Sequence, residues 1–309
     1  MLVKGGISTF FYLLYLGMNG LIVVNQTVGH NEYKIKRFIE EFSKKNIDIQ
    51  VFVNDGTLAK IVNDDIVINL PNADFVFYLD KDIYLVRLLE KAGFRLFNKA
   101  DFIKLCDDKM LTFIACANQG IKMPKTIAGP LVYSDLQESN YVFLDKVIEE
   151  LSLPIVVKKV YGSLGEGVYL VKTKEELRKL YTDIARNPII FQEYVQNSFG
   201  QSVRVLIIDG KVFGSFIRYN SLDFRSNYGD KATSKILENP EKYEGFAQEI
   251  ADKLQIEYAG IDLFVCENDQ PVLCEINSNA FFEEFEKVTG KNVAEAVRDM
   301  VIRKVNTHE

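Results

Sequence analysis

Short apolar runs alternate with segments of helical spacing over the first hundred residues. Residues 32–45 carry apolar side chains at positions 35, 38, 39 and 42, a spacing that places them on one face of a helix. A second helix is predicted over residues 83–92, and it ends at Gly93, a residue suited to the left-handed end of a helix. The runs that predict strands are residues 21–25, 49–53, 75–79 and 94–97. Strands that alternate with helices predict a parallel, open sheet, so we expect residues 18–100 to form an α/β domain.

The middle of the chain predicts a small lobe, at about residues 125–190, in which a glycine-rich turn joins two strands. The strands are expected at residues 154–160 and 168–171. Thr173 and Glu176 form a capping box, which predicts a helix from there to about residue 184. The remaining expectations for this part are helices at residues 107–119 and 144–151 and a loop at residues 129–140.

The last third of the chain carries the longest strand signals. Asp209-Gly210 lies between two apolar runs and is the strongest short hairpin signal in the sequence. Asn268-Asp269-Gln270 predicts a second hairpin turn. The expected strands are residues 189–195, 203–208, 212–217, 260–266 and 271–276, and the expected helices are residues 243–254 and 293–305. These elements predict a C-terminal lobe at about residues 191–309, within one larger domain of residues 101–309.

Composition narrows the class of protein. With 37 basic and 43 acidic residues the net charge is −6, and no basic block is present that would track nucleic-acid phosphates. The four cysteines, Cys106, Cys116, Cys266 and Cys274, form no CxxC pair, which favours reduced core residues in a cytoplasmic protein. The only two histidines are His30 and His308, so a histidine-based zinc site or catalytic triad is not expected.

The first seventeen residues stand apart from this pattern. Residues 7–16 are apolar and follow Lys4, which imitates a secretory signal, but the run is too short to span a membrane as a helix. The first persuasive strand begins only after Met18. We therefore interpret residues 1–17 as an extension of uncertain status, either upstream of the native start or loosely docked. No membrane partner is expected.

Two groups of residues have chemistry that the apolar pattern does not explain. Lys158 precedes the glycine-rich turn of residues 162–167, whose glycines lie between two strands and match neither a Walker A motif nor a Rossmann fingerprint. Such a turn can fold over phosphates, with the lysine beside them, or it can be a flexible hairpin with a surface lysine. The residues alone leave these two interpretations equally open.

An acidic pair in apolar strands is the second group. Glu275 and Asn277 point to the same face of one predicted strand, and a register exists that brings Asp262 of the neighbouring strand close to Glu275. Hard oxygen ligands of this kind suit Mg²⁺, which binds through one or two carboxylates together with substrate phosphates. The alternative is a pair of outward-facing acids on a one-sided sheet. The neighbouring residues on both faces of these strands are apolar, which indicates that the acids are buried and favours the metal site.

Basic residues among the C-terminal strands form a third, weaker group. Arg204, Arg218, Arg225 and Lys235 could line a pocket for a carboxylate or an acyl-phosphate. They could equally be a solvated face of the sheet, and composition alone favours that simpler interpretation.

Four separated segments, in order and spacing, resemble the RimK-type ATP-grasp ligases over roughly residues 100–305. Each segment is a weak signal, and the four together are specific. They are Asp108-Lys109, PIVVKKVYGSLGEGV, FQEYVQNSFGQSVRVLIIDGKVFGSFIRY with the later DFRSN, and AGIDLFVCENDQPVLCEINSN. The resemblance implies an ATP-grasp fold of the α/β class, preceded by an open α/β pre-ATP-grasp domain. The likeness over residues 18–99 is one of pattern only.

The resemblance also implies a role for individual residues. Lys109 and Lys158 would contact the ATP phosphates, and the turn with Gly162, Ser163, Gly165 and Gly167 would close over them. Glu193 and Tyr194 would hold the adenine, and Ser202, Ser226 and Asn227 match nucleotide-contacting positions. Arg204, Arg218 and Arg225 are the candidate catalytic residues: the first two match arginines expected near the reacting phosphate, and Arg225 matches a stretch that contacts the nucleotide and the intermediate. Asp262, Glu275 and Asn277 match the metal ligands.

Two departures from the family pattern concern the substrates. Ser202 stands where the family commonly has an acidic residue, which puts the expected ribose contact in doubt. After the metal motif the chain runs Asn279-Ala280-Phe281 where the family usually continues Ser-Pro-Gly, beside the acceptor site. The acceptor therefore does not follow from the family.

The activity that the resemblance implies is an ATP-dependent ligation of a carboxylate to an amine through an acyl-phosphate. ATP with Mg²⁺, or Mn²⁺ as an alternative ion, would be the cofactors. An amino acid such as glutamate would be joined to a peptide, a protein tail or a small amine, and a homo-oligomer is compatible with the family. Two other outcomes stay open: a dipeptide or glutathione-type ligase or kinase-like phosphotransferase of the same fold, and a nucleotide-binding module without catalysis.

Overall fold

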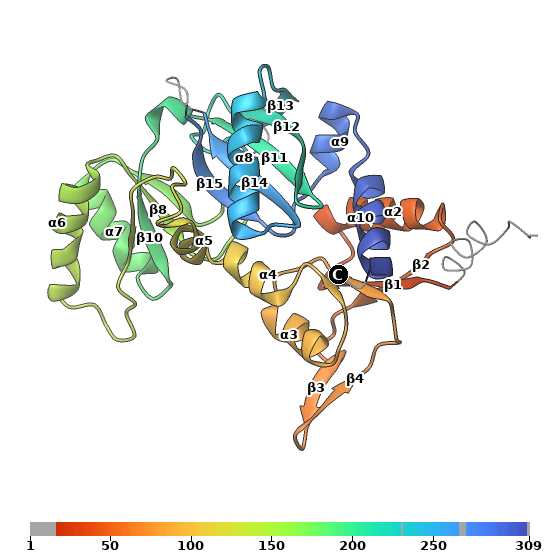
Figure 1. The fold of residues 1–309 in the computed structure, drawn as a ribbon. Helices are drawn as coiled ribbons and strands as arrows, with labels where there is room; N and C mark the ends of the chain where they lie inside the picture. Colours follow the sequence, from red (N-terminus) through yellow and green to blue (C-terminus); the bar gives the residue numbers. More distant parts are fainter. Residues whose placement is uncertain (1–16, 230, 266–269, 308–309) are drawn as a thin grey trace, which may run out of the picture. The chain divides into compact units, whose positions relative to one another are not determined.

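The computed structural model describes residues 17–229, 231–265 and 270–307 (Figure 1). The N-terminal extension up to residue 16, the turn at residues 268–269, Cys266 and His308 lie outside the described residues. By their contacts, the residues form two compact units, one of which contains the chain up to Lys104 together with the segment from Asn279 onward. The other unit is Leu105–Ser278. The predicted domain boundaries at residues 100–101 and about 190 stay a prediction.

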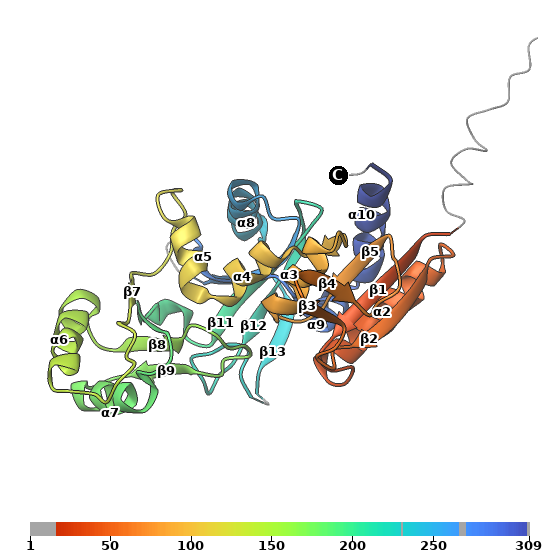
Figure 2. The ribbon, with the colours of Figure 1, turned by 90° about the horizontal axis from the view of Figure 1, so that it is seen from below.

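A parallel four-stranded sheet is the centre of the first unit, as the alternation of strands and helices predicts. Its order is β2-β1-β5-β6, and every neighbouring pair is parallel. Figure 2 shows helix α2 (His30–Ser43) beside β1 and β2. Phe38 and Phe42 of this helix pack on Phe75 and Phe77 of the sheet, with the rings of Phe38 and Phe77 stacked 4.7 Å apart. The strands are β1 (Asn19–Val24), β2 (Asp48–Val53), β5 (Phe75–Tyr78) and β6 (Leu96–Phe97).

Charged side chains fasten the C-terminal helix to this unit. Arg298 of α10 (Val293–Thr307) is almost fully buried and donates to the carboxylate of the equally buried Glu41 in α2. Arg37 of α2 bonds Glu286 of α9 (Glu283–Thr289), and Glu286 in turn accepts the first backbone amide of α10. The opposite face of the sheet is covered by α3 (Ile83–Lys91) and by the start of α4 (Ala100–Asp107).

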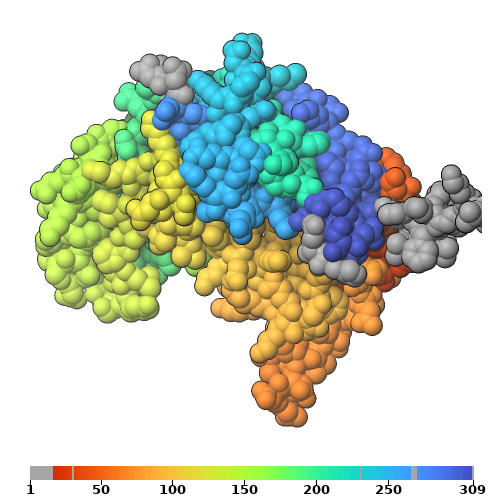
Figure 3. Space-filling model, viewed as in Figure 1, coloured from red at the N-terminus to blue at the C-terminus, as the bar shows by residue number. Residues whose placement is uncertain are grey.

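A two-stranded hairpin in the first unit escaped prediction. β3 (Ala59–Val62) and β4 (Asp65–Ile68) pair only with each other, and Figure 3 shows this hairpin, in orange, projecting from its unit. Ile61 is 69% exposed. An apolar run that short and that exposed has no helical or core pattern from which it could be recognised.

Lys34 in α2 is buried without a carboxylate partner within hydrogen-bond distance in the described residues. Its ammonium donates to Asn279 and lies 4.9 Å from the ring centre of Phe281. Burial lowers the pKa of Lys34 from 10.5 to about 7, although the charge of Asp80 opposes the change. Between those two values the unfolded chain binds a proton that the folded chain does not, so stability should rise with pH across this window.

We therefore expect Lys34→Met to raise the free energy of unfolding at pH 7 by about 2 kcal/mol, because a buried cation is replaced by an apolar side chain of similar length. The gain should shrink as the pH is raised toward 10.5, where the lysine of the unfolded chain also becomes neutral. Urea unfolding at pH 7 and pH 9 would measure both effects. Lys36→Met, an exposed position of the same helix, is the control. A gain that does not depend on pH would contradict the prediction.

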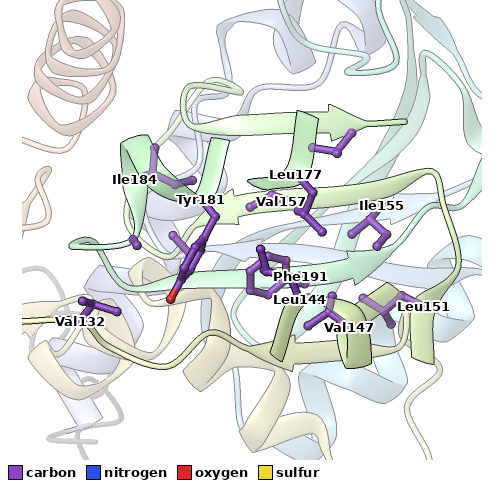
Figure 4. Close-up of a cluster of buried hydrophobic side chains, with 13 residues drawn as sticks. Val132, Leu144, Val147, Leu151, Ile155, Val157, Leu177, Tyr181, Ile184 and Phe191 are labelled. Carbon is purple, nitrogen blue, oxygen red and sulfur yellow. The ribbon is translucent and has the colours of Figure 1, made fainter. Parts of the chain in front are cut away.

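The small lobe of the second unit is a four-stranded antiparallel sheet with helices on one face. Its order is β7-β10-β8-β9. Ile155 and Val157 of β8 point into a core with α6 and α7, which Figure 4 shows around Phe191 and Tyr181. Because strand residues alternate, Val156 and Lys158 point to the other face. The elements are β7 (Thr126–Ala128), α6 (Ser139–Leu151), β8 (Ile155–Lys159), β9 (Val168–Val171), α7 (Lys174–Ile184) and β10 (Ile189–Glu193).

The predicted capping box at the start of α7 is confirmed. The hydroxyl of Thr173 accepts a hydrogen bond from the backbone amide of Glu176, and the Glu176 carboxylate accepts one from the amide of Thr173. We expect Thr173→Ala to reduce the free energy of unfolding by about 1 kcal/mol, the usual effect of losing such a cap. Thr182→Ala, an exposed change inside the same helix, should have little effect. Equal losses in urea titrations of the two variants would contradict this.

The large lobe is a five-stranded sheet of order β13-β12-β11-β14-β15, with all neighbours antiparallel. Ser215, opposite Val205, bonds Glu244 of α8, so α8 covers that face. Ser202 and Arg204 therefore point to the other face of the sheet. The elements are the 3₁₀ turn η1 (Gln196–Ser198), β11 (Gln201–Ile208), β12 (Lys211–Tyr219), β13 (Thr233–Ile236), α8 (Glu241–Leu254), β14 (Tyr258–Phe264) and β15 (Val272–Asn277).

The Asp209-Gly210 hairpin is confirmed, and it joins β11 to β12. Both residues have positive φ, 55° and 72°, as a two-residue hairpin turn requires. The helix predicted over residues 107–119 is wrong in its bounds: α4 ends at Asp107, Asp108 caps a separate helix, and α5 (Lys109–Cys116) follows. Its side chain accepts the amide of Leu111, which ends one helix and begins the next. In the part of the chain that the structure describes, no helix has both the length and the apolar character needed to cross a membrane.

Candidate active site

A cleft within the second unit separates the small lobe from the large sheet. Its empty volume, with the open mouth included, is about 880 Å³. The free face of β8 and the site-facing residues of β11, β14 and β15 form its walls, and the glycine-rich turn forms part of its rim. The alternation of the strands thus turns polar side chains of both sheets toward one space, while the apolar ones face the helices.

Most of the residues that the family resemblance singled out line this cleft. Those that do are Lys109, Lys158, Gly162, Ser163, Gly165, Glu193, Tyr194, Ser202, Arg225, Ser226, Asn227, Asp262 and Glu275. Arg204, Arg218 and Asn277 lie behind its wall and bond Asp262. Gly167 ends the turn, where its carbonyl accepts the amide of Lys159. Lys235, on β13 opposite Ile217, lies over the ring of Tyr219 and is not part of the cleft lining.

The two predicted acidic residues face each other. β14 and β15 pair so that Asp262 lies directly opposite Glu275, with a register shift immediately after Asp262. The register inferred from the sequence is therefore confirmed. Asp262 is only 3% exposed, which excludes the alternative of an outward-facing acid at this position.

Two buried arginines compensate the charge of Asp262. Arg204 grips both carboxylate oxygens, with 2.6 Å from its Nη2 to Oδ2, and Nη1 of Arg218 lies 3.3 Å from Oδ1. Burial raises the pKa of Asp262, and the two guanidinium groups oppose that rise. The fork geometry of Arg204 holds the carboxylate in one orientation. The three side chains thus form one connected unit, in which Asp262 lines the cleft and the two arginines lie behind it.

Glu275 has the opposite electrostatic character. Burial by itself would raise its pKa, but the ammonium of Lys109, the amide of Asn277 and the charge of Arg204 lower the pKa of Glu275 to about 2. This carboxylate therefore carries a full negative charge at neutral pH. It is the acidic group of the floor that is best suited to face a cation.

Asn277 presents its amide nitrogen to both carboxylates. Nδ2 lies 3.0 Å from the Glu275 carboxylate and 3.3 Å from that of Asp262. A carboxamide that donates through its nitrogen cannot bind a cation at the same place, so coordination by Asn277 requires its side-chain amide to turn over. The two carboxylates and that amide oxygen are hard donors of the kind that Mg²⁺ takes, and in this respect the residues fit the ion. No group of three or more His, Cys, Asp or Glu residues gathers as a metal site in the described ranges.

The glycine-rich turn is tied to the start of α5. The ammonium of Lys109 donates to the carbonyls of Val160, at 3.2 Å, and Gly162, at 2.9 Å. Tyr161 donates to Asp108, the cap of the same helix. Lys158 is buried on the cleft face of β8, only 7% exposed. The interpretation of the turn as a flexible hairpin with a surface lysine is therefore wrong for the lysine.

The other end of the cleft is apolar and aromatic. Tyr194 packs edge-on against Phe224, with ring centres 6.4 Å apart. The chain leaves β10 there, and Glu193 exchanges hydrogen bonds with the backbone of Lys125. A flat heteroaromatic ring has the shape and polarity for such a slot.

Ser202 pairs with Ser226 at the cleft wall. Their hydroxyl oxygens are 2.6 Å apart, and both residues are buried. This neutral pair occupies the position at which the family that the sequence resembles commonly has an acidic side chain. Two hydroxyls can each donate and accept, so the site keeps hydrogen-bonding capacity without charge.

Sequence reasoning missed part of the lining, for an identifiable reason. Gln192 is fully buried on the cleft face of β10 and bonds Thr126, and Cys274 neighbours Glu275. The sequence signal for Gln192 was a polar residue inside the apolar run of residues 189–195, and only the pairing of β8 with β10 places it on the cleft face. The missed residues are Val156, Leu164, Glu166, Val168, Gln192, Val195, Ser198, Gln201, Phe224, Phe264 and Cys274.

Comparison with known proteins decides the family. The model of the RimK-like ATP-grasp domain matches residues 106–301. The chain belongs to the RimK-like ATP-grasp family. It is 33% identical over 264 residues to "Beta-citrylglutamate synthase B" of Danio rerio, a match that covers 82% of this chain and 64% of that protein. It is 31% identical over 223 residues to "N-acetylaspartylglutamate synthase A" of Homo sapiens, covering 71% and 55%.

The fold of this RimK-like chain is also that of solved ATP-grasp structures. The D-alanine–D-alanine ligase from Bacillus anthracis complexed with ATP superposes with a TM-score of 0.70 at 18% identity, covering 94% of this chain and 98% of that one. The predicted fold class and the predicted family are thereby confirmed, and an ATP-grasp fold implies ATP binding. The chain spans less than two thirds of the length of the two synthases.

Proposed function

We propose that this protein is an ATP-dependent ligase that joins a carboxylate to an amine through an acyl-phosphate. The observation that carries the proposal is the cleft in which Lys109, Lys158, Asp262 and Glu275 meet on the floor and the glycine-rich turn forms the rim. Phosphoryl transfer needs little from a protein beyond positioning and compensation of spread negative charge. That chemistry needs no histidine, so the presence of only two histidines in the sequence does not count against it.

The residues divide the work by their position. Lys109 and Lys158 would hold the phosphates of ATP, and Tyr194 with its aromatic neighbour Phe224 would enclose the base. Arg204 and Arg218, released in part from Asp262, would compensate charge on the transferring phosphoryl group and on the substrate carboxylate. The turn at residues 162–167 would exclude water from an intermediate that hydrolyses easily.

Magnesium would be held by Asp262 and Glu275, with Asn277 as a third ligand once its amide has turned. When bound, the ion would supply Lewis-acid compensation of charge on the triphosphate. The protein's own residues orient that set: Arg204 fixes the Asp262 carboxylate, and Lys109 keeps Glu275 ionised.

Glutamate is proposed as one of the two substrates. The names of both synthases reported above denote compounds that contain glutamate, and this chain shares about a third of its matched residues with them. The partner of glutamate is not copied from either protein, because Asn279-Ala280-Phe281 departs from the family pattern beside the expected acceptor site. A cytoplasmic location is proposed on the cysteine content, since Cys116 and Cys274 are free thiols in the described residues. Cell fractionation would test the location.

The test is a screen for ADP release over amino acids and other carboxylates, with hydroxylamine as a substitute amine. A hydroxamate identifies the carboxylate that is activated, and replacement of hydroxylamine by glutamate then tests whether glutamate supplies the amine. Formation of a stable phosphorylated product without an amine would instead identify a kinase-like enzyme. ATP binding without ADP formation under any condition would overturn the proposal in favour of a binding module.

A further inference from the structure

Arg225 holds the tip of the glycine-rich turn from the opposite lobe. Its Nη1 donates to the carbonyl of Gly165 at 2.9 Å and lies 3.4 Å from that of Val168. The central carbon of its guanidinium also lies over the Tyr228 ring, 3.4 Å from the ring centre. The turn belongs to the small lobe and Arg225 to the segment after β12 of the large lobe, so these contacts join the two rims of the cleft.

Asp223 sets the orientation of Arg225. Its two carboxylate oxygens accept from Nε at 2.9 Å and from Nη2 at 2.8 Å, and Oδ1 also accepts the backbone amide of Arg225. The hydrogen bonds from Arg225 lower the pKa of Asp223, so the carboxylate stays charged. With Nε and Nη2 bound in this fork, Nη1 is the group directed to the turn.

The segment that carries Asp223 is itself rigidly built. The buried Asn220 accepts the amides of Leu222 and Asp223 through Oδ1 and donates to the carbonyl of Tyr228. Gly200 has a φ of 61°, and a Cβ there would lie 1.9 Å from the carbonyl oxygen of Asn220, so only glycine permits this close approach. These contacts therefore hold the segment that carries Asp223 in place on the large lobe.

The glycine-rich turn approaches this segment of the large lobe closely at one glycine. Gly165 has a φ of 77°, and a Cβ added there would lie 3.1 Å from the Tyr228 ring and 3.2 Å from Cδ of Arg225. The preceding Leu164 also has positive φ, and the amide of Glu166 bonds the carbonyl of Ser163 to close the turn. The turn thus presents its carbonyl at residue 165 to Arg225 with no side chain between them.

We propose that Arg225 is a clasp that fastens the glycine-rich turn to the large lobe, and that Asp223 is the positioning residue that aims it. The inference rests on the proposed function, since it assigns to Arg225 and Asp223 the control of how the glycine-rich turn closes over the same nucleotide site. It also revises the expected role of Arg225. The guanidinium is bound to the carbonyls of the turn at the rim of the cleft, so entry of a triphosphate requires the clasp to open and close again.

The first measurement needs no activity. Hydrogen exchange of the nucleotide-free full chain should show amides 162–167 exchanging roughly tenfold faster in Asp223→Asn and Arg225→Ala, because each loses charge-assisted hydrogen bonds. Arg225→Lys should restore only part of the protection, since an ammonium cannot bind Asp223 through a fork and Gly165 at once. Arg178→Ala, which removes an exposed ion pair of the small lobe, is the control. Unchanged exchange of these amides in Asp223→Asn and Arg225→Ala overturns the clasp.

A glycine pair gives an independent variant. Gly165→Ala should speed exchange of the turn, because the new methyl group collides with Tyr228 and Arg225. Gly210→Ala has a similar positive φ but meets only ordinary contact at 3.8 Å, so it tests the cost of the backbone conformation alone. Equal exchange of the turn in both glycine variants would contradict the clasp.

Kinetics then separate this inference from the function on which it rests. If the protein is a ligase, Asp223→Asn should raise KM for ATP by roughly tenfold with a smaller change in kcat, and should increase ADP formed per amide product because water enters. Faster exchange in the variants, together with a chain that never forms ADP, would support the clasp and overturn the proposed ligase activity. Ligase activity with unchanged exchange in the variants would support the proposed function and overturn the clasp.

Discussion

A Glu275→Gln variant is expected to form ADP at least about a hundredfold more slowly than the native chain. Its melting temperature should fall as well, because folding stabilises the ionised Glu275 carboxylate. The glutamine keeps the size of the side chain and can still accept the hydrogen bond from Asn277. It loses the negative charge that Lys109 and Arg204 stabilise, and with it the group best suited to face a divalent ion. Steady-state ADP release and thermal unfolding would measure the two effects.

The matched control is Glu138→Gln. Glu138 is 84% exposed in an ion pair of the small lobe, so this variant should keep both activity and stability. Removal of divalent ions with a chelator should stop ADP formation by the native chain, and added Mg²⁺ should restore it. Full activity of Glu275→Gln would defeat the assignment of this carboxylate to the metal.

Asp262→Asn should lose stability as well as activity. We expect the free energy of unfolding to fall by about 3–5 kcal/mol, because Arg204 and Arg218 would be left buried without their shared carboxylate. An asparagine can accept a hydrogen bond at one atom only, so the fork of Arg204 cannot be satisfied. Both acids of the site therefore support stability as well as turnover, Glu275 through the charge of Lys109 and Asp262 through its two arginines.

Urea unfolding followed by circular dichroism would measure this loss. The control is Asp135→Asn, which breaks an ion pair with Arg186 in which the aspartate is 90% exposed, and which should not measurably change stability. A double variant, Asp262→Asn with Arg204→Met, should recover part of the lost stability, since one of the two buried cations that shared the Asp262 carboxylate is removed. An Asp262→Asn chain as stable as the native one would show that the arginines are not buried by folding.

The contact between Asp262 and its two arginines could not be predicted from the sequence. A solvated face was the simpler interpretation of Arg204 and Arg218 on composition, and only the pairing of β11 with β12 and β14 placed both on one carboxylate. Side-chain spacing along one strand gives the face on which a residue lies. It does not give the neighbour strand, and β11 lies 50 residues or more from β14 in the chain.

Local signals by themselves determined the strands and helices of the N-terminal unit, the capping box at Thr173, the Asp209-Gly210 hairpin and the position of the glycine-rich turn. Each depends on residues close together in the chain, where alternation, capping and turn conformation follow from short-range sterics and hydrogen bonds. The tertiary structure alone decided that Asn277 turns its nitrogen to the carboxylates, that Ser202 meets Ser226, and that Arg225 reaches the turn at Gly165. The contacts of Ser202 with Ser226 and of Arg225 with Gly165 join residues 24 and 60 positions apart in the chain. The orientation of Asn277 toward Asp262 requires the pairing of β14 with β15, so no local pattern records any of the three contacts.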